Sequence, residues 1–243
     1  MAVPEVQRAL RQVAQPRAHE YVAEQIRRVI LLRVVEPGGR LPYEQELAAA
    51  LGVSRSTITH ALRLLEREGL VEVRRGRGGG VFSLGVKADG GDPDVVSALR
   101  AERDDIVAAV ELRAVVEPAV AALAAERGAS ERLRSLEALN EEMRSAEGDD
   151  HRFMRADTQF HLEIAAAAGS RLLADAVEQG CLTLSRALEA LPDSAAWHER
   201  SVKQHERLLA ALRRGDAAKA RAAMARHVDD TNRALGLMLR TLG

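Results

Sequence analysis

Residues 43–69 read YEQELAAALGVSRSTITHALRLLEREG, and this stretch decides the fold of the N-terminal part of the chain. Its first part, up to Leu51, has the composition of a short helix, and the glycine that follows predicts a tight turn. Ser54 is placed to cap a second helix over 55–68, because apolar residues recur there at helical spacing and Gly69 comes directly afterwards. Two helices joined by a short glycine-containing turn form a helix-turn-helix pattern.

The flanking segments extend this pattern to a winged helix. Residues 17–33 carry apolar side chains at helical spacing and predict a helix that precedes the pattern. Residues 70–74 alternate and are β-prone, residues 75–80 read RGRGGG, and residues 81–84 are again β-prone, which predicts a β-hairpin with a basic tip. Such a tip can enter the minor groove of DNA, where arginine is favoured and glycine permits close approach. The alternative is that the glycine run is only a flexible tip.

The composition favours a mostly α protein with two domains. The chain has 243 residues, and only 2% of them are aromatic while 47% are hydrophobic, with many Ala and Leu. We expect a cytoplasmic protein, because no apolar run approaches the roughly 18 residues of a membrane span and no apolar signal core begins the chain. Residues 1–85 carry 13 Lys and Arg against 9 Asp and Glu, whereas the remainder carries 22 against 27. This asymmetry points to the N-terminal part as the one that could meet phosphates.

The pattern of helices and breakers divides the chain into four parts. We expect an N-terminal extension over 1–16, a winged helix-turn-helix of three helices and a β-hairpin wing over 17–84, a linker over 85–98, and an all-α helical-bundle effector domain over 99–241. The last part shows about six helical patterns separated by Gly and Pro. Pro118 falls inside the first of them, and we expect a kink there instead of an end, because the apolar pattern continues beyond it.

Five polar residues fall on the apolar stripes of these helices: Arg113, Asp157, His161, His205 and His227. Buried polar groups without partners cost about 2–7 kcal/mol each, so the five need a shared explanation. Asp157 and His161 lie four residues apart on one helix face, and the other two histidines can converge on the same ion from later helices. This donor set suits Zn²⁺, Ni²⁺, Mn²⁺ or Fe²⁺. The alternative is four independently satisfied core or surface residues.

Several motifs of the N-terminal part resemble the DNA-binding domain of GntR-family regulators. They are residues 37–42 (PGGRLP), 46–48 (ELA), 52–55 (GVSR), 61–62 (AL) and 64–71 (LLEREGLV). The resemblance implies that Arg55 reaches the operator and that Arg75 and Gly76 reach the minor groove. The chain departs from the family in having Gln45 and Thr59 where many relatives carry arginine, and His60 where glutamate is usual. The expected DNA-binding residues are Gln45, Ser54, Arg55, Ser56, Thr57, Thr59, His60, Arg75 and Gly76.

The C-terminal part resembles the helical effector domain, of FCD type, in the FadR branch of the same family. The matching motifs are residues 111–113 (ELR), 117–118 (EP), 123–127 (LAAER), 157–161 (DTQFH), 205–211 (HERLLAA), 215–216 (GD) and 224–227 (MARH). The resemblance implies that Asp157, His161, His205 and His227 hold one divalent metal ion per chain and that a small organic acid binds beside it. Arg113 would then face the carboxylate of the acid, since it otherwise lacks a buried partner.

Together these patterns predict a sequence-specific DNA-binding transcriptional regulator, which we expect to be a repressor. Its operator affinity would be modulated by a small carboxylate bound at the metal. We expect a homodimer on a two-fold operator, because one recognition helix covers only a few base pairs. We expect no enzymatic activity. Two alternatives are a regulator with a purely structural metal and a metal-dependent hydrolase, although the sequence places no candidate general base beside the ligands.

Overall fold

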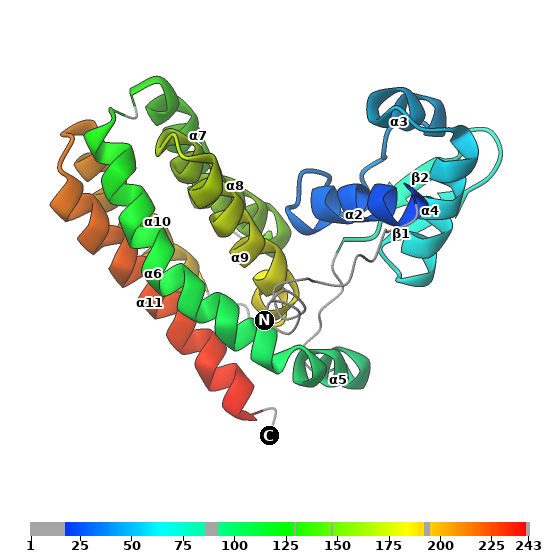
Figure 1. Cartoon of the computed structure of the whole chain (residues 1–243). Helices are drawn as coiled ribbons and strands as arrows, with labels where there is room; N and C mark the ends of the chain where they lie inside the picture. Colours follow the sequence, from blue (N-terminus) through cyan, green and yellow to red (C-terminus); the bar gives the residue numbers. More distant parts are fainter. Residues whose placement is uncertain (1–17, 86–91, 129, 147, 192–194, 242–243) are drawn as a thin grey trace, which may run out of the picture.

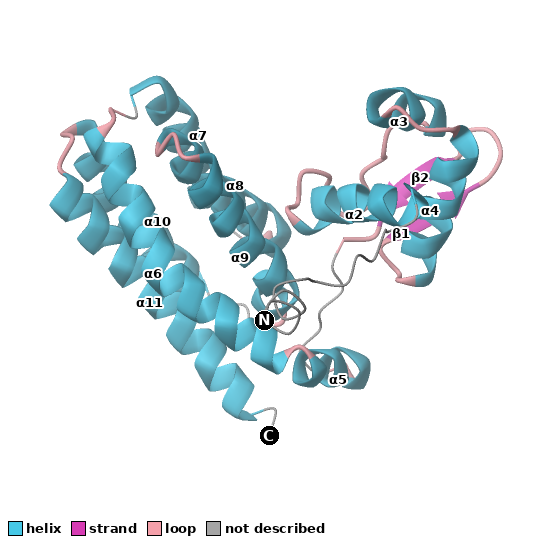
Figure 2. Cartoon of the chain, viewed as in Figure 1, coloured by secondary structure: helices cyan, strands magenta, loops and turns pink. Residues whose placement is uncertain are grey.

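The computed structural model of the chain describes residues 18–85, 92–128, 130–146, 148–191 and 195–241. Within these residues it contains ten α-helices and two β-strands. Figure 1 shows a small N-terminal unit beside a larger bundle of long helices, and Figure 2 shows that the two strands belong to the small unit. The predicted mostly α fold is therefore confirmed. The expected N-terminal extension over 1–16 lies outside the described residues.

The N-terminal unit is a winged helix-turn-helix, as predicted. Its elements are α2 (Ala18–Leu31), α3 (Glu44–Leu51), α4 (Arg55–Arg67), β1 (Val71–Arg74) and β2 (Gly80–Ser83). The strands pair antiparallel, with Val71 opposite Ser83. Ile58 and Leu65 of α4 are fully buried against α2 and the hairpin. Burying an aliphatic side chain of this size contributes about 1.5–3 kcal/mol, so this core fixes α4 relative to the wing.

Two residues build the turn between α3 and α4. Gly52 ends α3 in the left-handed conformation, with φ 65°, and its N–H donates to Ala48 O. The side chain of Ser54 accepts a hydrogen bond from the Thr57 N–H at 3.2 Å and so caps the N-terminus of α4. The left-handed conformation costs residues with a β-carbon about 1–2 kcal/mol, which explains the glycine at this point.

The C-terminal domain is a bundle of long helices around α6. These helices are α6 (Arg103–Glu126), α7 (Ser130–Arg144), α8 (Asp150–Ala167), α9 (Arg171–Glu189), α10 (Ala195–Arg213) and α11 (Ala217–Thr241). Helix α6 packs against α8, α9, α10 and α11, and it continues through Pro118 as predicted. Phe153 and Phe160 of α8 lie fully buried in the core. Within the described parts of the chain, no helix is both long and apolar enough to cross a membrane.

The expected linker over 85–98 is partly helical. Helix α5 (Pro93–Ala101) begins inside it, where the Asp92 carboxylate accepts a hydrogen bond from the Asp94 N–H at 2.9 Å and Pro93 occupies the first turn. These are favourable residues for a helix start. Val95 and Leu99 of α5 are buried in an apolar cluster with α6, α9 and α11. The apolar face of α5 thus packs the last residues of the expected linker against the bundle.

The end of α2 contacts the helical domain directly. The side chain of Gln159, on α8, donates to Leu32 O at 3.0 Å. Arg33 forms an ion pair of 2.5 Å with Glu189 of α9, and both side chains are nearly buried. Arg33 is the only residue other than glycine with a positive φ, 56°, in the described part of the chain. Arg33 thus adopts an unfavourable backbone conformation at the junction between the two units, and its ion pair with Glu189 stabilises this conformation.

We expect Gly52→Ala to lower the free energy of unfolding of the winged helix by about 1–2 kcal/mol, because an added β-carbon disfavours the left-handed conformation. No atom lies within 4 Å of that β-carbon, so the effect would come from the backbone alone. Gly52→Asn serves as the control, since asparagine adopts this conformation more readily and should lose less. Denaturant titration of the three proteins measures the difference. Equal losses for both variants would contradict the explanation.

Candidate metal centre and nucleic-acid interface

The four predicted ligands meet in one buried cluster. Helix α8 supplies Asp157 and His161 one turn apart, α10 supplies His205, and α11 supplies His227. One ligand atom from each of the four lies within 4.8 Å of the other three. The Nε2 atom of His227 is 3.0 Å from that of His161 and 3.3 Å from that of His205. Three different helices therefore direct imidazole nitrogens toward one point.

Two further side chains determine how the rings face that point. Glu117 of α6 places Oε2 at 2.5 Å from His161 Nδ1, and Gln204 of α10 places Oε1 at 3.1 Å from His227 Nδ1. Because carboxylate and amide oxygens only accept hydrogen bonds, these positions favour the hydrogen on Nδ1 in both rings. With the hydrogens on Nδ1, the Nε2 atoms of His161 and His227 would face each other with their lone pairs, at 3.0 Å. A cation placed between the two nitrogens would offset the repulsion of these lone pairs.

The electrostatics of the cluster favour the metal ion. Burial lowers the pKa of His205 and His227 well below the ordinary value, which keeps both rings neutral, the form that binds metals. Burial also raises the pKa of Asp157, and its Oδ1 atom is buried without a hydrogen-bond partner. A divalent cation would offset this penalty, because it favours the ionised carboxylate. Three imidazoles and one carboxylate therefore fit a divalent metal.

Arg113 also lies in the core, but the expectation that it lacks a buried partner is wrong. Its Nε donates to Glu117 Oε1 at 2.5 Å, and both side chains are buried. Although burial opposes ionisation, Arg113 and His161 hold the pKa of Glu117 below its ordinary value, and Glu117 raises that of Arg113. Arg113 thus stabilises the charge of the carboxylate that holds His161.

Glu117 and Gln204 were not among the residues predicted from sequence. The signal for Glu117 was an acid four residues after Arg113 on a helix that is otherwise apolar on that face. For Gln204 the only signal was its position directly before His205. A glutamine beside a buried ligand can equally well face solvent, so this signal does not distinguish the two cases.

The predicted DNA-contacting residues lie on α3, α4 and the wing. Gln45, Arg55 and Gly76 line one groove of about 780 Å³ between α3, the start of α4 and the hairpin. The Arg55 guanidinium donates to Gln45 Oε1, so the two side chains form one exposed polar pair. Arg75 is exposed at the tip of the wing, beside Gly76 with φ 91°. This groove brings the recognition helix and the wing to the same side of the domain.

The remaining predicted residues occupy the first two turns of α4 or its cap. Ser54 caps the helix and its hydroxyl lies 2.8 Å from those of Ser56 and Thr57. The hydroxyl of Thr59 donates to Glu44 Oε2 at 2.9 Å, which was not predicted. The ring of His60 lies edge-to-face with that of His19, at 5.8 Å between centroids. The cap serine and Thr59 are thus engaged in local contacts.

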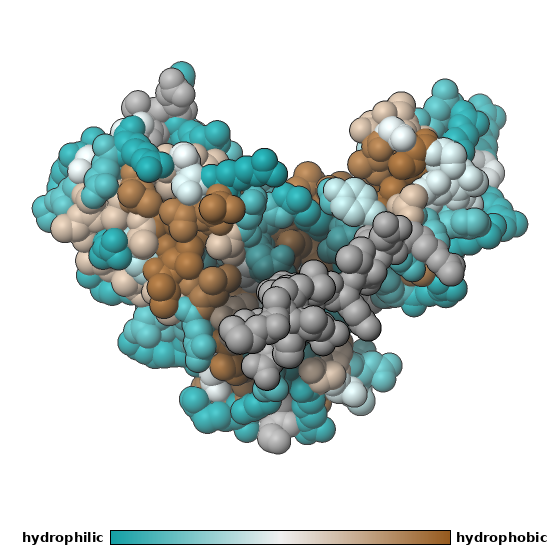
Figure 3. Space-filling view, viewed as in Figure 1, coloured by the Kyte–Doolittle hydropathy of each residue, from teal (hydrophilic) through white to brown (hydrophobic). Residues whose placement is uncertain are grey.

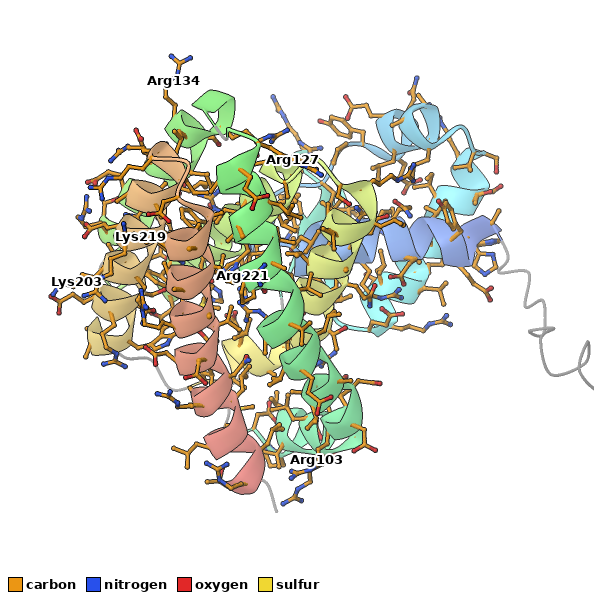
Figure 4. The ribbon with its side chains drawn as sticks, turned by 60° about the vertical axis from the view of Figure 1, so that its left-hand side comes forward. Arg103, Arg127, Arg134, Lys203, Lys219 and Arg221 are labelled. Atoms are coloured by element: carbon orange, nitrogen blue, oxygen red, sulfur yellow. The ribbon has the colours of Figure 1, made fainter. Side chains whose placement is uncertain are left out.

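The basic residues of the helical domain have a different distribution from those of the wing. Figure 4 labels six of them, from α6 and its C-terminal cap, α7, α10 and α11, and shows them spread over the length of the bundle. Arg103 and Arg127 each donate to a main-chain carbonyl, Leu239 O and Ala168 O. These two arginines therefore tie helix ends together.

Comparisons with known proteins separate the same two parts of the chain, the winged helix and the helical domain. The family model described as bacterial regulatory proteins, gntR family, matches residues 18–81, and the model of the FCD domain matches residues 108–230. The E. coli McbR/YncC structure superposes with a TM-score of 0.53 at 22% identity, covering 91% of this chain and 98% of that chain. At this identity the likeness concerns the fold.

Two curated relatives carry names that describe transcriptional regulators. The HTH-type transcriptional regulator LutR of Bacillus subtilis is 31% identical over 202 residues, which cover 80% of this chain and 90% of LutR. The Uxu operon transcriptional regulator of Escherichia coli is 31% identical over 226 residues, covering 90% of this chain and 87% of the relative. The chain therefore belongs to the gntR family of bacterial regulatory proteins and is a DNA-binding transcriptional regulator with an FCD domain.

Proposed function

We propose that this regulator represses transcription and that its operator affinity changes when a small carboxylate binds at a divalent metal in the helical domain. The observation that carries the proposal is the convergence of three Nε2 atoms and the Asp157 carboxylate in a buried site. Asp157, His161, His205 and His227 would hold the ion, which would act as a Lewis acid toward the oxygens of the ligand. The buried Arg113 supplies a cation near the same cluster.

The contact between the two units supports coupling of this site to DNA binding. Helix α8 carries Asp157 and His161 on its inner face, while Gln159 between them donates to Leu32 O at the end of α2. A small displacement of α8 would therefore act on the segment that begins the winged helix. The alternative of a purely structural metal predicts no effect of metal or acid on operator affinity, so DNA titrations distinguish the two.

A homodimer is part of the proposal, since two recognition helices are needed to read a two-fold operator. Val107 and Val115 of α6 support it, because their side chains are 41% and 73% exposed. Figure 3 shows apolar residues gathered over α6 on this face of the molecule. An exposed apolar face of this kind is typical of a surface that pairs with another protein.

We expect purified, metal-replete protein to contain about one divalent ion per chain, and His161→Ala, His205→Ala or His227→Ala to lose most of it, because three ligands leave an incomplete coordination shell. Elemental analysis measures the content and identifies the metal. His151→Ala is the matched control, since this exposed histidine pairs with Glu189 outside the cluster. Metal content near zero in the unsubstituted protein would refute the metal site.

We expect Arg55→Ala to weaken operator binding by about 1–3 kcal/mol and to relax its specificity, as the loss of a base contact does. Arg75→Ala should weaken binding if the wing tip enters the minor groove. Arg171→Ala is the control, because this arginine is exposed on α9 and lies away from the groove. Fluorescence anisotropy over a salt titration measures affinity, and the mass of the complex gives the number of chains. The proposed contacts of α4 and the wing with DNA would be contradicted if Arg55→Ala and Arg75→Ala both bound with wild-type affinity. A single chain per operator would contradict the proposed dimer.

We expect mono- or dicarboxylates that stabilise the protein to change its operator affinity by about 1–3 kcal/mol, and the same acid to bind the DNA-bound protein with the reciprocal change. The variant for this test is Arg113→Met combined with Glu117→Gln. Removing Arg113 alone would leave a buried carboxylate unpaired at a cost of about 3–5 kcal/mol. Glutamine at position 117 still offers an oxygen to His161.

A thermal-shift screen followed by DNA titrations measures both effects. The double variant should fold and bind the operator, yet lose the response to acid, whereas Arg132→Met, on the exposed surface of α7, should retain it. Equal stabilisation of wild type and double variant by every acid would show that Arg113 has no part in ligand binding. Stabilisation without any change in operator affinity would show that binding of the acid does not regulate DNA binding.

A further inference from the structure

Gln204 connects the cluster to a carboxylate near the surface. Its Oε1 lies 3.1 Å from His227 Nδ1, and its Nε2 donates to Asp230 Oδ2 at 2.5 Å. Gln204 is on α10, directly before His205, whereas Asp230 is on α11, one turn after His227. Gln204 is half-buried, and 34% of the Asp230 side chain is exposed. A chain of polar contacts therefore leads from the surface to one of the ligands.

The chemistry of these groups fixes the orientation of the amide. A carboxylate can only accept hydrogen bonds, so the NH₂ end of Gln204 must face Asp230 and its oxygen must face His227. His227 must then carry its hydrogen on Nδ1, and the lone pair of Nε2 faces the other ligands. The reverse orientation of the amide would place its NH₂ group against Nδ1 and force the hydrogen onto Nε2, where it would block a metal.

We propose that Asp230 is a positioning residue for the metal centre, which acts through the Gln204 amide to set the tautomer of His227. The inference rests on the proposed metal-binding function. Hydrogen-bond partners of this kind orient ligating histidines and raise their basicity. Asp230 touches no ligand atom in its own right, so its whole effect passes through the orientation of Gln204.

The neighbouring aspartate supplies a matched control. Asp229 precedes Asp230 on α11, and its exposed carboxylate pairs with Arg233. Asp230 also pairs with Arg233, at 3.4 Å, so replacing either aspartate alters the same arginine. The two differ in that Gln204 donates to Asp230. A comparison of the two substitutions therefore isolates the contact with Gln204 from the general loss of a surface charge.

The test compares Asp230→Asn, Asp229→Asn and the unsubstituted protein. An asparagine at position 230 can offer either an oxygen or an NH₂ group to Gln204, so both amide orientations become available. We expect the population of His227 with hydrogen on Nε2 to rise, as measured by long-range ¹H–¹⁵N NMR of the metal-free protein. We also expect Zn²⁺ affinity, measured by competition with a chelator, to fall about 10- to 100-fold. Asp229→Asn should change neither quantity.

A second variant tests whether a fall in Zn²⁺ affinity can occur without a loss of folding. Gln204→Leu keeps the approximate size of the side chain and removes the acceptor, and it should lower Zn²⁺ affinity to a similar extent while the thermal unfolding transition is retained. The proposal is overturned if His227 of the metal-free wild type carries its hydrogen on Nε2, or if Asp230→Asn binds Zn²⁺ as tightly as Asp229→Asn. If the wild type binds no divalent metal, the proposed metal function fails, while the NMR measurement still decides whether Asp230 sets the tautomer.

Discussion

The helical domain depends on one constraint, the need to satisfy a carboxylate and three imidazoles that are buried in its core. Each group would cost several kcal/mol if it were left alone. Two side chains next to the cluster contribute to this, since Glu117 contacts Nδ1 of His161 and Gln204 contacts Nδ1 of His227. These contacts turn the lone pairs inward, where they repel one another unless a cation is present. A cation in this cluster, as proposed above, would therefore stabilise the polar centre of the core.

The same helix that carries two of the ligands also meets the DNA-binding unit. Asp157 and His161 lie on the inner face of α8, and Gln159, between them in sequence, reaches the main chain at Leu32. The adjacent Arg33 keeps a left-handed backbone and is held there by Glu189. A residue in such a conformation persists only where its surroundings hold it, so this junction is sensitive to small shifts of α8 and α9. The proposed coupling between the metal site and the DNA-binding unit would thus have a short physical route, through α8 and the main chain at Leu32.

The sequence predicted most of the fold and the four residues that meet in the buried cluster, but not the side chains that surround them. Gly52 and Ser54 act locally, so their roles in the turn could be inferred from neighbouring residues. The four ligands interrupted apolar stripes, a signal that periodicity makes visible. Glu117 and Gln204 act across helices, and their contacts depend on helix rotation and side-chain orientation, which a one-dimensional pattern does not contain. The partner of Arg113 was missed for the same reason, although it lies only one turn away.

The main effect of the ion pair between Arg113 and Glu117 is to orient the ring of His161. Burying two charges costs solvation energy that their attraction only partly returns, so apolar residues of similar size would stabilise the core at least as well. An apolar side chain at position 117 would, however, leave His161 free to place its hydrogen on either nitrogen. Glu117 removes that freedom, and Arg113 keeps the carboxylate ionised despite its burial. The contact of Glu117 with His161 therefore explains why the bundle keeps a buried ion pair that costs solvation energy. This contact orients a ligand of the proposed metal site.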